Sequence, residues 1–587
     1  MGNAKLVLSR RRVVIGLLAV ALLVVALFVW QAVTASRALL DSRERAETVQ
    51  TRIQAGDFDG ASRALGDLQK STRTAHARTG GLLWDIGRRI PYVGRNIGAV
   101  QTVSAVLDTA TRINAPIALQ LSQAVSDGRF RPAAGTIDLS EVVRLTPDVR
   151  RAADSIAKAG TDLDAIRPGR LTFPFNDLVG DLQDQVARAR SAAGGAADAF
   201  ELLPQMLGRD GARDYLLMIQ NPAELRSTGG LPGSLAILHA DGGKVSMTWQ
   251  GSATDLKGFS GPVVKLAKDT LAQYGPTPAT DFRDINFSPD FPEAAQVARA
   301  MVKQKLGTTV DGVISVDPIA LGALLQGIGP VRLTSGVVLT GANIAATLLN
   351  DTYVRIQDPT RQDDFFEDSA RKVFDAVMAG QGNQQVAIRG LAAGASQHRV
   401  LLWSADAQEQ ARFAGTAIGG ELTSDTGGTP HIGMYLNDST AGKMDYYLHY
   451  RTSATPVDCR KGGSQDLRAT MVLTSTMPKN FSRLGPYVLG NGDFAKPGTI
   501  AFNLRVYAPY GGQITGMKVD GEPVSVTADK DHGRQVGFLP FSLAPGQQST
   551  VTADIRTAAG QDADGVFDYT PGILPAPNGV RINSACG

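Results

Sequence analysis

The sequence predicts a multidomain protein: an N-terminal transmembrane helix and helical stalk, a central α/β domain and a C-terminal all-β sandwich. Three observations predict this order. Apolar residues recur at helical spacing up to about residue 206, strands then alternate with helices, and after about residue 430 short alternating strands dominate. A chain of 587 residues is also too long for one hydrophobic core. The expected parts are a cytoplasmic tail at 1–12, a transmembrane helix at 13–33, a helical stalk or bundle at 34–206, the α/β domain at 207–422, a linker at 423–430 and the β-sandwich at 431–587.

The N-terminal segment carries the prediction of a membrane anchor. Val13–Trp30 is an uncharged apolar run that would span about 27 Å as a helix, at about 1.5 Å per residue. Lys5 and Arg10–Arg12 precede it, so the positive-inside bias places the N-terminus in the cytoplasm and the rest of the chain outside. The expected localisation is a single-pass protein of the cell membrane. A cleaved signal peptide ending near Val33–Ala35 is the alternative interpretation.

Charge and cysteine content limit the function classes. The formal net charge of +3 comes from 59 basic and 56 acidic residues, which leaves no electrostatic footprint of a nucleic-acid binder. Cys459 and Cys586 bracket the C-terminal segment, and a disulfide between them would contribute about 4 to 5 kcal/mol in the chain-entropy model. Two unrelated buried thiols are the alternative. The six histidines lack ligand spacing, so no metal cage is predicted.

The predicted elements follow the hydrophobic periodicity. Tyr215–Ile219 reads as a strand, and two more strands flank the turn Asp241–Gly243 as a hairpin. Further elements of the α/β domain are expected as helices at 263–274, 292–306, 318–327, 341–349 and 368–378, with a strand at 311–316. The domain is expected to continue through 399–403 and 405–414. Beyond the linker, strands are expected at 444–451, 467–475, 500–506, 525–527 and 549–555, as in two packed antiparallel sheets.

Two arginine-bearing segments are candidate anion sites. Asn221–Gly230 connects two strands, and its glycines would let backbone amides approach a ligand while Arg226 clamps a phosphate. A tight connection in which Glu224 pairs with Arg226 is the favoured interpretation of that segment on the sequence alone. The second segment carries Arg355, Arg361 and Arg371, which suit a pyrophosphate if they face a cleft, or else form a charged solvent face.

Two other segments have a structural interpretation. Asp290 is expected to cap the helix that begins at Pro292. Asn437–Lys443 is interpreted as a turn rather than a site. Nucleophile elbow, phosphate loop, zinc helix and dinucleotide motifs are all missing from the sequence in the required context, which counts weakly against common hydrolases and kinases.

Several of these segments together resemble bacterial membrane proteins of the domain of unknown function 4012 family. The resemblance covers roughly residues 80–455 and implies no settled activity. It is carried by Tyr215–Ser234, Ser288–Pro292, Val310–Pro318, Tyr435–Asp438 and Lys443–Leu448.

A more distant resemblance is to the LytR-CpsA-Psr phosphotransferases, which move glycopolymers from polyprenyl-pyrophosphate carriers onto peptidoglycan. Leu225–Thr228, Lys244–Asp255, Val310–Val331 and Leu339–Met378 resemble that family's parts in the same order. The resemblance implies a LytR-CpsA-Psr-like central domain with Arg226, Asp255, Arg355 and Arg371 near a pyrophosphate, and Mg²⁺ as the cofactor if the chain is an active transferase. We therefore expect Arg226, Arg355 and Arg371 to converge on one face of the domain.

The sequence departs from that family at two points. Thr228 stands where an acidic residue is expected, and Gly251–Asp255 lacks the arginine expected before the aspartate. Fewer charges would bind magnesium pyrophosphate less well. The leading hypothesis is an envelope-assembly protein that binds or transfers an anionic lipid-linked glycan, with the membrane, a polyprenyl-linked glycan or peptidoglycan as partners. The alternative is a non-enzymatic envelope scaffold or adhesion protein.

Overall fold

The computed structural model describes residues 3–172, 175–423 and 427–586, so residues 424–426 of the expected linker lie outside the description. Side chains of residues 1–25, 29, 39 and 40 are also outside it. The described chain forms two compact units. The helical unit comprises Met1–Arg131 and Asp138–Gln205, and the mixed unit comprises Pro132–Ile137 and Met206–Gly587.

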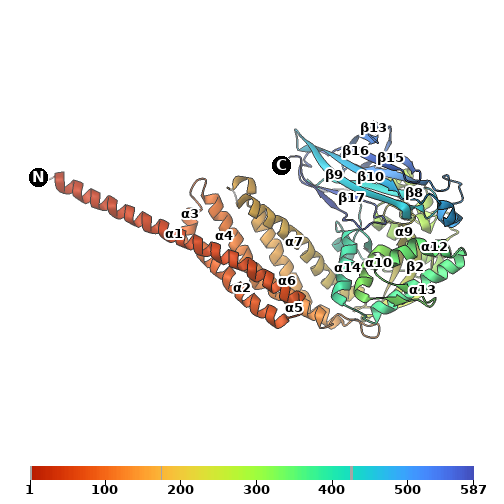
Figure 1. The fold of residues 1–587 in the computed structure, drawn as a ribbon, viewed down its shortest axis with the longest axis horizontal. Helices are drawn as coiled ribbons and strands as arrows, with labels where there is room; N and C mark the ends of the chain where they lie inside the picture. The colour runs from red at the N-terminus through yellow and green to blue at the C-terminus, as the bar shows by residue number, and fades with distance from the viewer. Residues whose placement is uncertain (1–2, 173–174, 424–426, 587) are drawn as a thin grey trace. The chain divides into compact units, whose positions relative to one another are not determined.

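The helical unit is an assembly of helices, as the apolar periodicity predicts (Figure 1). Asp138 begins α6 by accepting a hydrogen bond from the Ser140 amide at 2.9 Å, which satisfies an amide that has no partner inside the helix. The core consists of small clusters of Leu, Val and Ala between neighbouring helices. The helices are α1 (Asn3–Gln54), α2 (Phe58–Thr79), α3 (Leu82–Gly87), α4 (Gly94–Thr109), α5 (Ala115–Ser126), α6 (Leu139–Asp164) and α7 (Phe175–Met206).

The prediction of a transmembrane helix at 13–33 is corrected. In the part of the chain that the structure describes, no helix has the length and apolarity to cross a membrane. Helix α1 does not end near residue 33, and its described part packs on protein: Phe28 lies 4.9 Å from the ring of Trp84, whose Nε1 donates to Gln31 at 3.0 Å. The single-pass localisation in the cell membrane rested on this helix and is contradicted with it.

The mixed unit contains a five-stranded sheet of order β3-β2-β1-β4-β7, in which only β1 and β4 are parallel. The turn between β2 and β3 places Gly242 and Gly243 at φ of 55° and 87°, a conformation that glycine adopts without strain. The strands are β1 (Arg213–Asn221), β2 (Leu231–Asp241), β3 (Lys244–Ser252), β4 (Gly312–Val316) and β7 (Val400–Ser404), with a small hairpin of β5 (Val331–Arg332) and β6 (Val338–Leu339).

Helices cover both faces of this sheet. Alternate residues of the central strands, including Leu216 and Met218, pack on α9, while α10 and α13 lie against the opposite face. Asp290 caps α9 as predicted, accepting from the Glu293 amide at 3.2 Å. The helices are α8 (Lys268–Tyr274), α9 (Phe291–Leu306), α10 (Pro318–Ile328), α11 (Ile344–Ala346), α12 (Thr352–Arg355), α13 (Pro359–Met378), α14 (Gln384–Ser396) and α15 (Ala407–Phe413).

The β-rich C-terminal region forms two further sheets, of orders β13-β12-β16-β10-β9 and β14-β15-β11-β8-β17-β18. Alternate inward residues such as Met471 and Phe502 build a large core between the sheets. The elements are β8 (His431–Asp438), β9 (Leu448–Arg460), β10 (Ser464–Ser475), α16 (Pro486–Leu489), β11 (Ile500–Tyr507), β12 (Gln513–Val519), β13 (Glu522–Pro523), β14 (Thr527–Asp531), β15 (Arg534–Leu543), β16 (Gln548–Arg556), β17 (Gly565–Tyr569) and β18 (Val580–Ile582).

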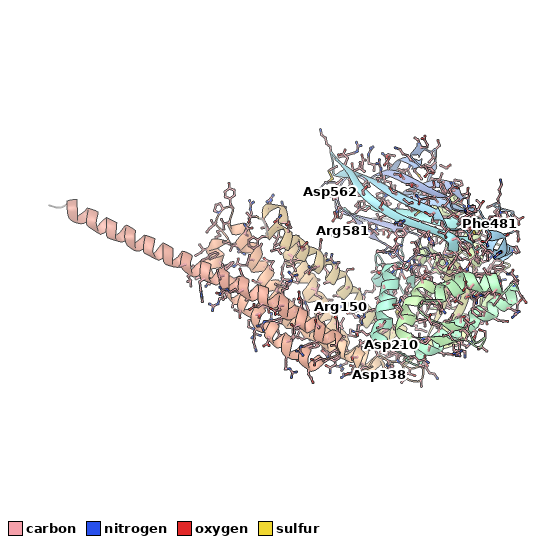
Figure 2. The ribbon with its side chains drawn as sticks, viewed as in Figure 1. Asp138, Arg150, Asp210, Phe481, Asp562 and Arg581 are labelled. Atoms are coloured by element: carbon pink, nitrogen blue, oxygen red, sulfur yellow. A yellow bond between two sulfur atoms is a disulfide. The ribbon has the colours of Figure 1, made fainter. Side chains whose placement is uncertain are left out.

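The predicted disulfide between Cys459 and Cys586 is confirmed. It ties the end of the chain to β9, with Cα atoms 4.9 Å apart across a sequence separation of 127. Arg581 in β18, labelled in Figure 2, adds a second tie because its Nε donates to Asp564 at 2.7 Å. The C-terminal segment is therefore fixed to the sandwich both covalently and by charge.

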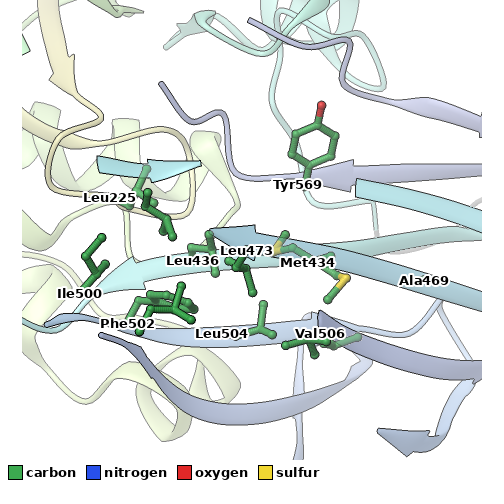
Figure 3. Packing of buried hydrophobic residues seen from close by; sticks show 14 of the residues in the cluster. Leu225, Met434, Leu436, Ala469, Leu473, Ile500, Phe502, Leu504, Val506 and Tyr569 are labelled. Atoms are coloured by element: carbon green, nitrogen blue, oxygen red, sulfur yellow. The ribbon is translucent and has the colours of Figure 1, made fainter. Parts of the chain in front are cut away.

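The connection between β1 and β2 joins the α/β layer to the sandwich. Its Leu225 is 1% exposed and belongs to the sandwich core, beside Leu436 and Leu473 (Figure 3). The Leu225 amide donates to Asp445 Oδ2 at 2.8 Å, and its carbonyl accepts from the Asp438 amide at 2.9 Å. One side chain thus completes the core of a domain that begins about 200 residues later in the sequence.

Candidate functional site

A cavity of about 630 Å³ opens in the mixed unit, between the α/β layer and the C-terminal sandwich. This volume lies within the range of roughly 300–1,000 Å³ that small-molecule sites occupy. The apolar part of its lining comes from β1, β2, α10, α11, the π-helical turn at Thr347–Asp351, and α13. The apolar lining residues are Ile219, Leu231, Pro318, Leu321, Ile344, Leu348, Leu349, Phe366, Ala370 and Val373.

A buried charge cluster closes one side of the cavity. Arg226 Nη2 donates to Glu224 Oε1 at 3.0 Å and to Asp284 Oδ1 at 2.8 Å. Lys443 pairs with the second oxygen of Glu224. The side chains of Arg226, Glu224 and Lys443 are 6%, 8% and 10% exposed, so each charge is neutralised inside the protein rather than by water.

The carboxyl groups of this cluster have shifted pKa values. Burial raises the pKa of Glu224, but Lys443 and Arg226 outweigh burial and hold that pKa below its usual value. Burial and the neighbouring Glu224 raise the pKa of Asp438 to about 6. Burial, and then Asp438, raise the pKa of Asp445 well above its usual value. The cluster holds more carboxyl groups than cations, since Glu224, Asp284, Asp438 and Asp445 lie near Arg226 and Lys443.

Aromatic rings form the adjoining wall. Tyr353 and Tyr487 stack with centroids 5.4 Å apart and an interplanar angle of 13°, and Lys443 Nζ lies 5.7 Å from each ring centroid. Asn221 Nδ2 donates to the Tyr353 hydroxyl at 2.5 Å. Burial raises the pKa of Tyr353 far above its usual value, so its hydroxyl stays protonated.

The four residues predicted near a pyrophosphate occupy different surroundings. Arg226 lines the cavity and is buried among carboxylates. Asp255 accepts from the Ser252 amide at 2.8 Å, as part of a capping box. Arg355 has a side chain that is 76% exposed and lies 3.8 Å from Asp351, while Arg371 is exposed on α13. Of the four, only Arg226 is among the residues that line the cavity.

The cavity rim offers poor surroundings for magnesium pyrophosphate. Among the lining residues, Arg226 and Lys443 are committed to Glu224, and Arg283 binds both oxygens of Asp281 at 3.0 and 2.5 Å. Within the described chain, no group of three or more histidines, cysteines and carboxylates is placed to hold a metal ion. The donor set therefore does not fit the Mg²⁺ that the transferase resemblance implies.

Sequence reasoning missed several residues that form the site. Lys443 was interpreted as part of a turn, and Tyr487, Phe494 and the apolar residue Leu321 were not singled out. The signal for Lys443 is its position, between the strand Tyr435–Asp438 and the aromatic residues Tyr446 and Tyr447. The other three carry no local signal.

The comparisons with known proteins bear on the central segment. Residues 210–353 match the model of the family described as Protein of unknown function (DUF4012), which supports the predicted resemblance to that family. No curated protein matches the chain. A crystal structure from Legionella pneumophila, described as a candidate nutrient binding protein, aligns with 24% of this chain and 55% of its own, at 8% identity and a TM-score of 0.14. That similarity is too low to carry an argument.

Proposed function

We propose that this protein binds a lipid-linked glycan during envelope assembly, holding the lipid chain in the cavity and the polar head at its rim. The observation that carries the proposal is the cavity itself, whose lining combines an apolar part with exposed polar and aromatic residues such as Asn491, Asp493 and Phe494. A ligand with an apolar chain and a polar head matches this division. Each methylene buried against the apolar part of the lining would contribute about 0.8 kcal/mol.

The geometry favours binding over transfer. A phosphotransferase needs cations that meet the charge developing on the phosphate. Here Arg226 is occupied by Glu224 and Asp284, and Arg355 and Arg371 do not line the cavity. The distant LytR-CpsA-Psr resemblance therefore supports the class of ligand, a lipid-linked glycan, more than the reaction. The disulfide between Cys459 and Cys586 supports a location in an oxidising compartment, where such bonds form and persist.

Titration of the purified chain with geranylgeraniol, whose head is uncharged, followed by calorimetry or native mass spectrometry, tests the proposal. Ala370→Trp places an indole in the cavity from a lining position on α13, and we expect it to weaken binding at least tenfold. Ile388→Trp on α14 is the matched control, because Ile388 is 48% exposed and does not line the cavity. Equal affinities of the two variants would refute the proposal.

A non-enzymatic envelope scaffold is the second candidate function. The observation that favours it is the burial of Arg226 against its own sequence neighbour Glu224, which is a structural pairing. A scaffold predicts that the wild-type chain shows no saturable binding of geranylgeraniol. The same titration therefore separates the two functions.

A further inference from the structure

We infer that the loop Gly485–Gly498 of the C-terminal sandwich, here called the mouth loop, forms a sugar-binding subsite at the opening of the cavity. This inference rests on the proposed function and assigns the residues that contact the head group. Five residues of the mouth loop that line the cavity carry the argument: Pro486, Tyr487, Asn491, Asp493 and Phe494.

The first observation is the exposure of aromatic rings at the mouth. Phe494 is 72% exposed and Tyr487 is 40% exposed, although both line the cavity. Tyr353 covers one face of the Tyr487 ring. An exposed aromatic ring beside a cavity can pack against the apolar C–H face of a pyranose ring. This contact buries the aromatic ring and removes no charged group from water.

The second observation is a pair of polar side chains without partners, which lie between Tyr487 and Phe494 in the sequence. Asn491 and Asp493 are exposed, and neither side chain forms a hydrogen bond or ion pair with the described part of the chain. An amide both donates and accepts, and a carboxylate accepts, so together they match the hydroxyl groups of a sugar. Asp493 would repel a phosphate, and the cations of the rim are already paired.

The third observation is that the mouth loop is anchored at its base and free at its tip. Val488 and Leu489 are buried in the sandwich core, and the Lys443 amide donates to the Val488 carbonyl at 2.8 Å. Phe481, labelled in Figure 2, packs partly buried against the same core just before the loop. A rigid base holds the aromatic and polar side chains in place, which lowers the entropy lost on binding.

Two surfactants with the same chain separate the head group from the lipid. Decyl maltoside and tetraethylene glycol monodecyl ether, each below its micelle concentration, are titrated into the full-length chain. We expect the wild type to bind the maltoside at least tenfold more tightly than the polyether. Phe494→Ala and Asn491→Ala should reduce this ratio to about threefold or less, because they weaken binding of the maltoside more than binding of the polyether.

Tyr510→Ala is the matched control, since Tyr510 is 43% exposed in the same domain but lies outside the cavity lining, and it should keep the wild-type ratio. Equal affinity of the wild type for both surfactants overturns the sugar subsite while leaving the cavity as a lipid site. Binding of neither surfactant overturns the proposed function itself. A ratio that survives both mouth-loop substitutions also overturns the assignment of these residues.

Discussion

The connection Asn221–Gly230 and the mouth loop Gly485–Gly498 border the same cavity but are built in opposite ways. Residues 221–230 are all buried, and their charged and polar groups find partners in the sandwich, such as Lys443 for Glu224 and Asn437 for Ser227. The tip of the mouth loop is exposed, and two of its polar side chains have no partner in the described chain. The charged groups of the connection are paired inside the protein and have a structural role. The polar groups of the mouth loop have no partner in the described chain and are the candidates for recognising a ligand.

This difference agrees with the interpretation that the sequence favours for the first of these regions, a tight connection in which Glu224 pairs with Arg226. Arg226 is the residue type of a phosphate clamp, but each of its three guanidinium nitrogens already donates a hydrogen bond within the protein. A buried ion pair is expensive to break and gains little from a ligand. The following predictions test the contrast, from the largest expected effect to the smallest.

Glu224→Ala should destabilise the mixed unit by about 3 to 5 kcal/mol, because it leaves Lys443 buried without its carboxylate. Urea unfolding measures the change, with hydrogen exchange of β1 and β8 to show which unit responds. Asp493→Ala in the mouth loop is the control and should change stability little. A loss below about 1 kcal/mol for Glu224→Ala would mean that the cluster does not hold the junction.

Leu225→Ala should cost about 3 kcal/mol, as for other large-to-small substitutions in a core. Leu225 belongs to the α/β layer in the sequence, but its side chain lies in the core of the C-terminal sandwich. Protection from hydrogen exchange should therefore fall in β1–β2 and in β8–β11 together. Leu271→Ala is the control, since Leu271 is 47% exposed. Loss of protection in only one sheet would show that the two layers unfold separately.

Stability should also fall at alkaline pH through His532. A hydrogen bond to Asp531 raises the pKa of His532 to about 9, helped by Asp531, Asp290 and Glu293 as neighbouring charges. The protonated form is favoured in the folded state, so its contribution is complete below about pH 6.5 and is lost as the pH rises through about 9.

This contribution to the free energy of unfolding is of the order of 2 kcal/mol. It is smaller than the pKa shift alone implies, because 23% of the His532 side chain is exposed and water screens its charge. Urea midpoints between pH 6 and pH 10 measure it. His532→Gln should flatten that part of the curve. An unchanged slope in the variant would assign the alkaline loss to other groups.

Phe494→Ala should change the free energy of unfolding by no more than about 0.5 kcal/mol, because the ring is 72% exposed. The same variant is expected to lose preference for the glycoside. Thermal unfolding and the surfactant titration measure the two effects on one sample. A large loss of stability would show that Phe494 has a structural role, and the mouth loop would then not differ from the connection Asn221–Gly230 in this respect.

Features fixed by neighbouring residues were predictable from the sequence. The helical N-terminal region, the β-rich C-terminal region, the hairpin at Asp241–Gly243 and the Asp290 cap all depend on local spacing or on one turn of chain. The disulfide followed from counting two cysteines. Residues 13–33 also have a clear local pattern, yet the anchor predicted from it is contradicted within the described chain.

Features fixed by distant partners were not predictable. The helix expected from residue 263 begins only at Lys268, because the Val263 amide donates to the Ala279 carbonyl. The strand expected from residue 444 begins with a 3₁₀ turn, because the Asp445 amide donates to the Ala223 carbonyl at 3.0 Å. The cavity is hidden for the same reason, since its walls combine segments from residue 219 to residue 494.

The buried junction also sets an order of events during synthesis. Leu225 and Ser227 leave the ribosome long before their partners: Asp445 follows Leu225 by 220 residues, and Thr570, whose hydroxyl donates to the Ser227 carbonyl at 3.1 Å, follows Ser227 by 343. Until then the nascent chain carries an apolar side chain and charged groups without partners. Such a chain is exposed to aggregation until these partners are made, at about 5–20 residues per second. Folding of the mixed unit is therefore expected to finish only after Thr570 has left the ribosome.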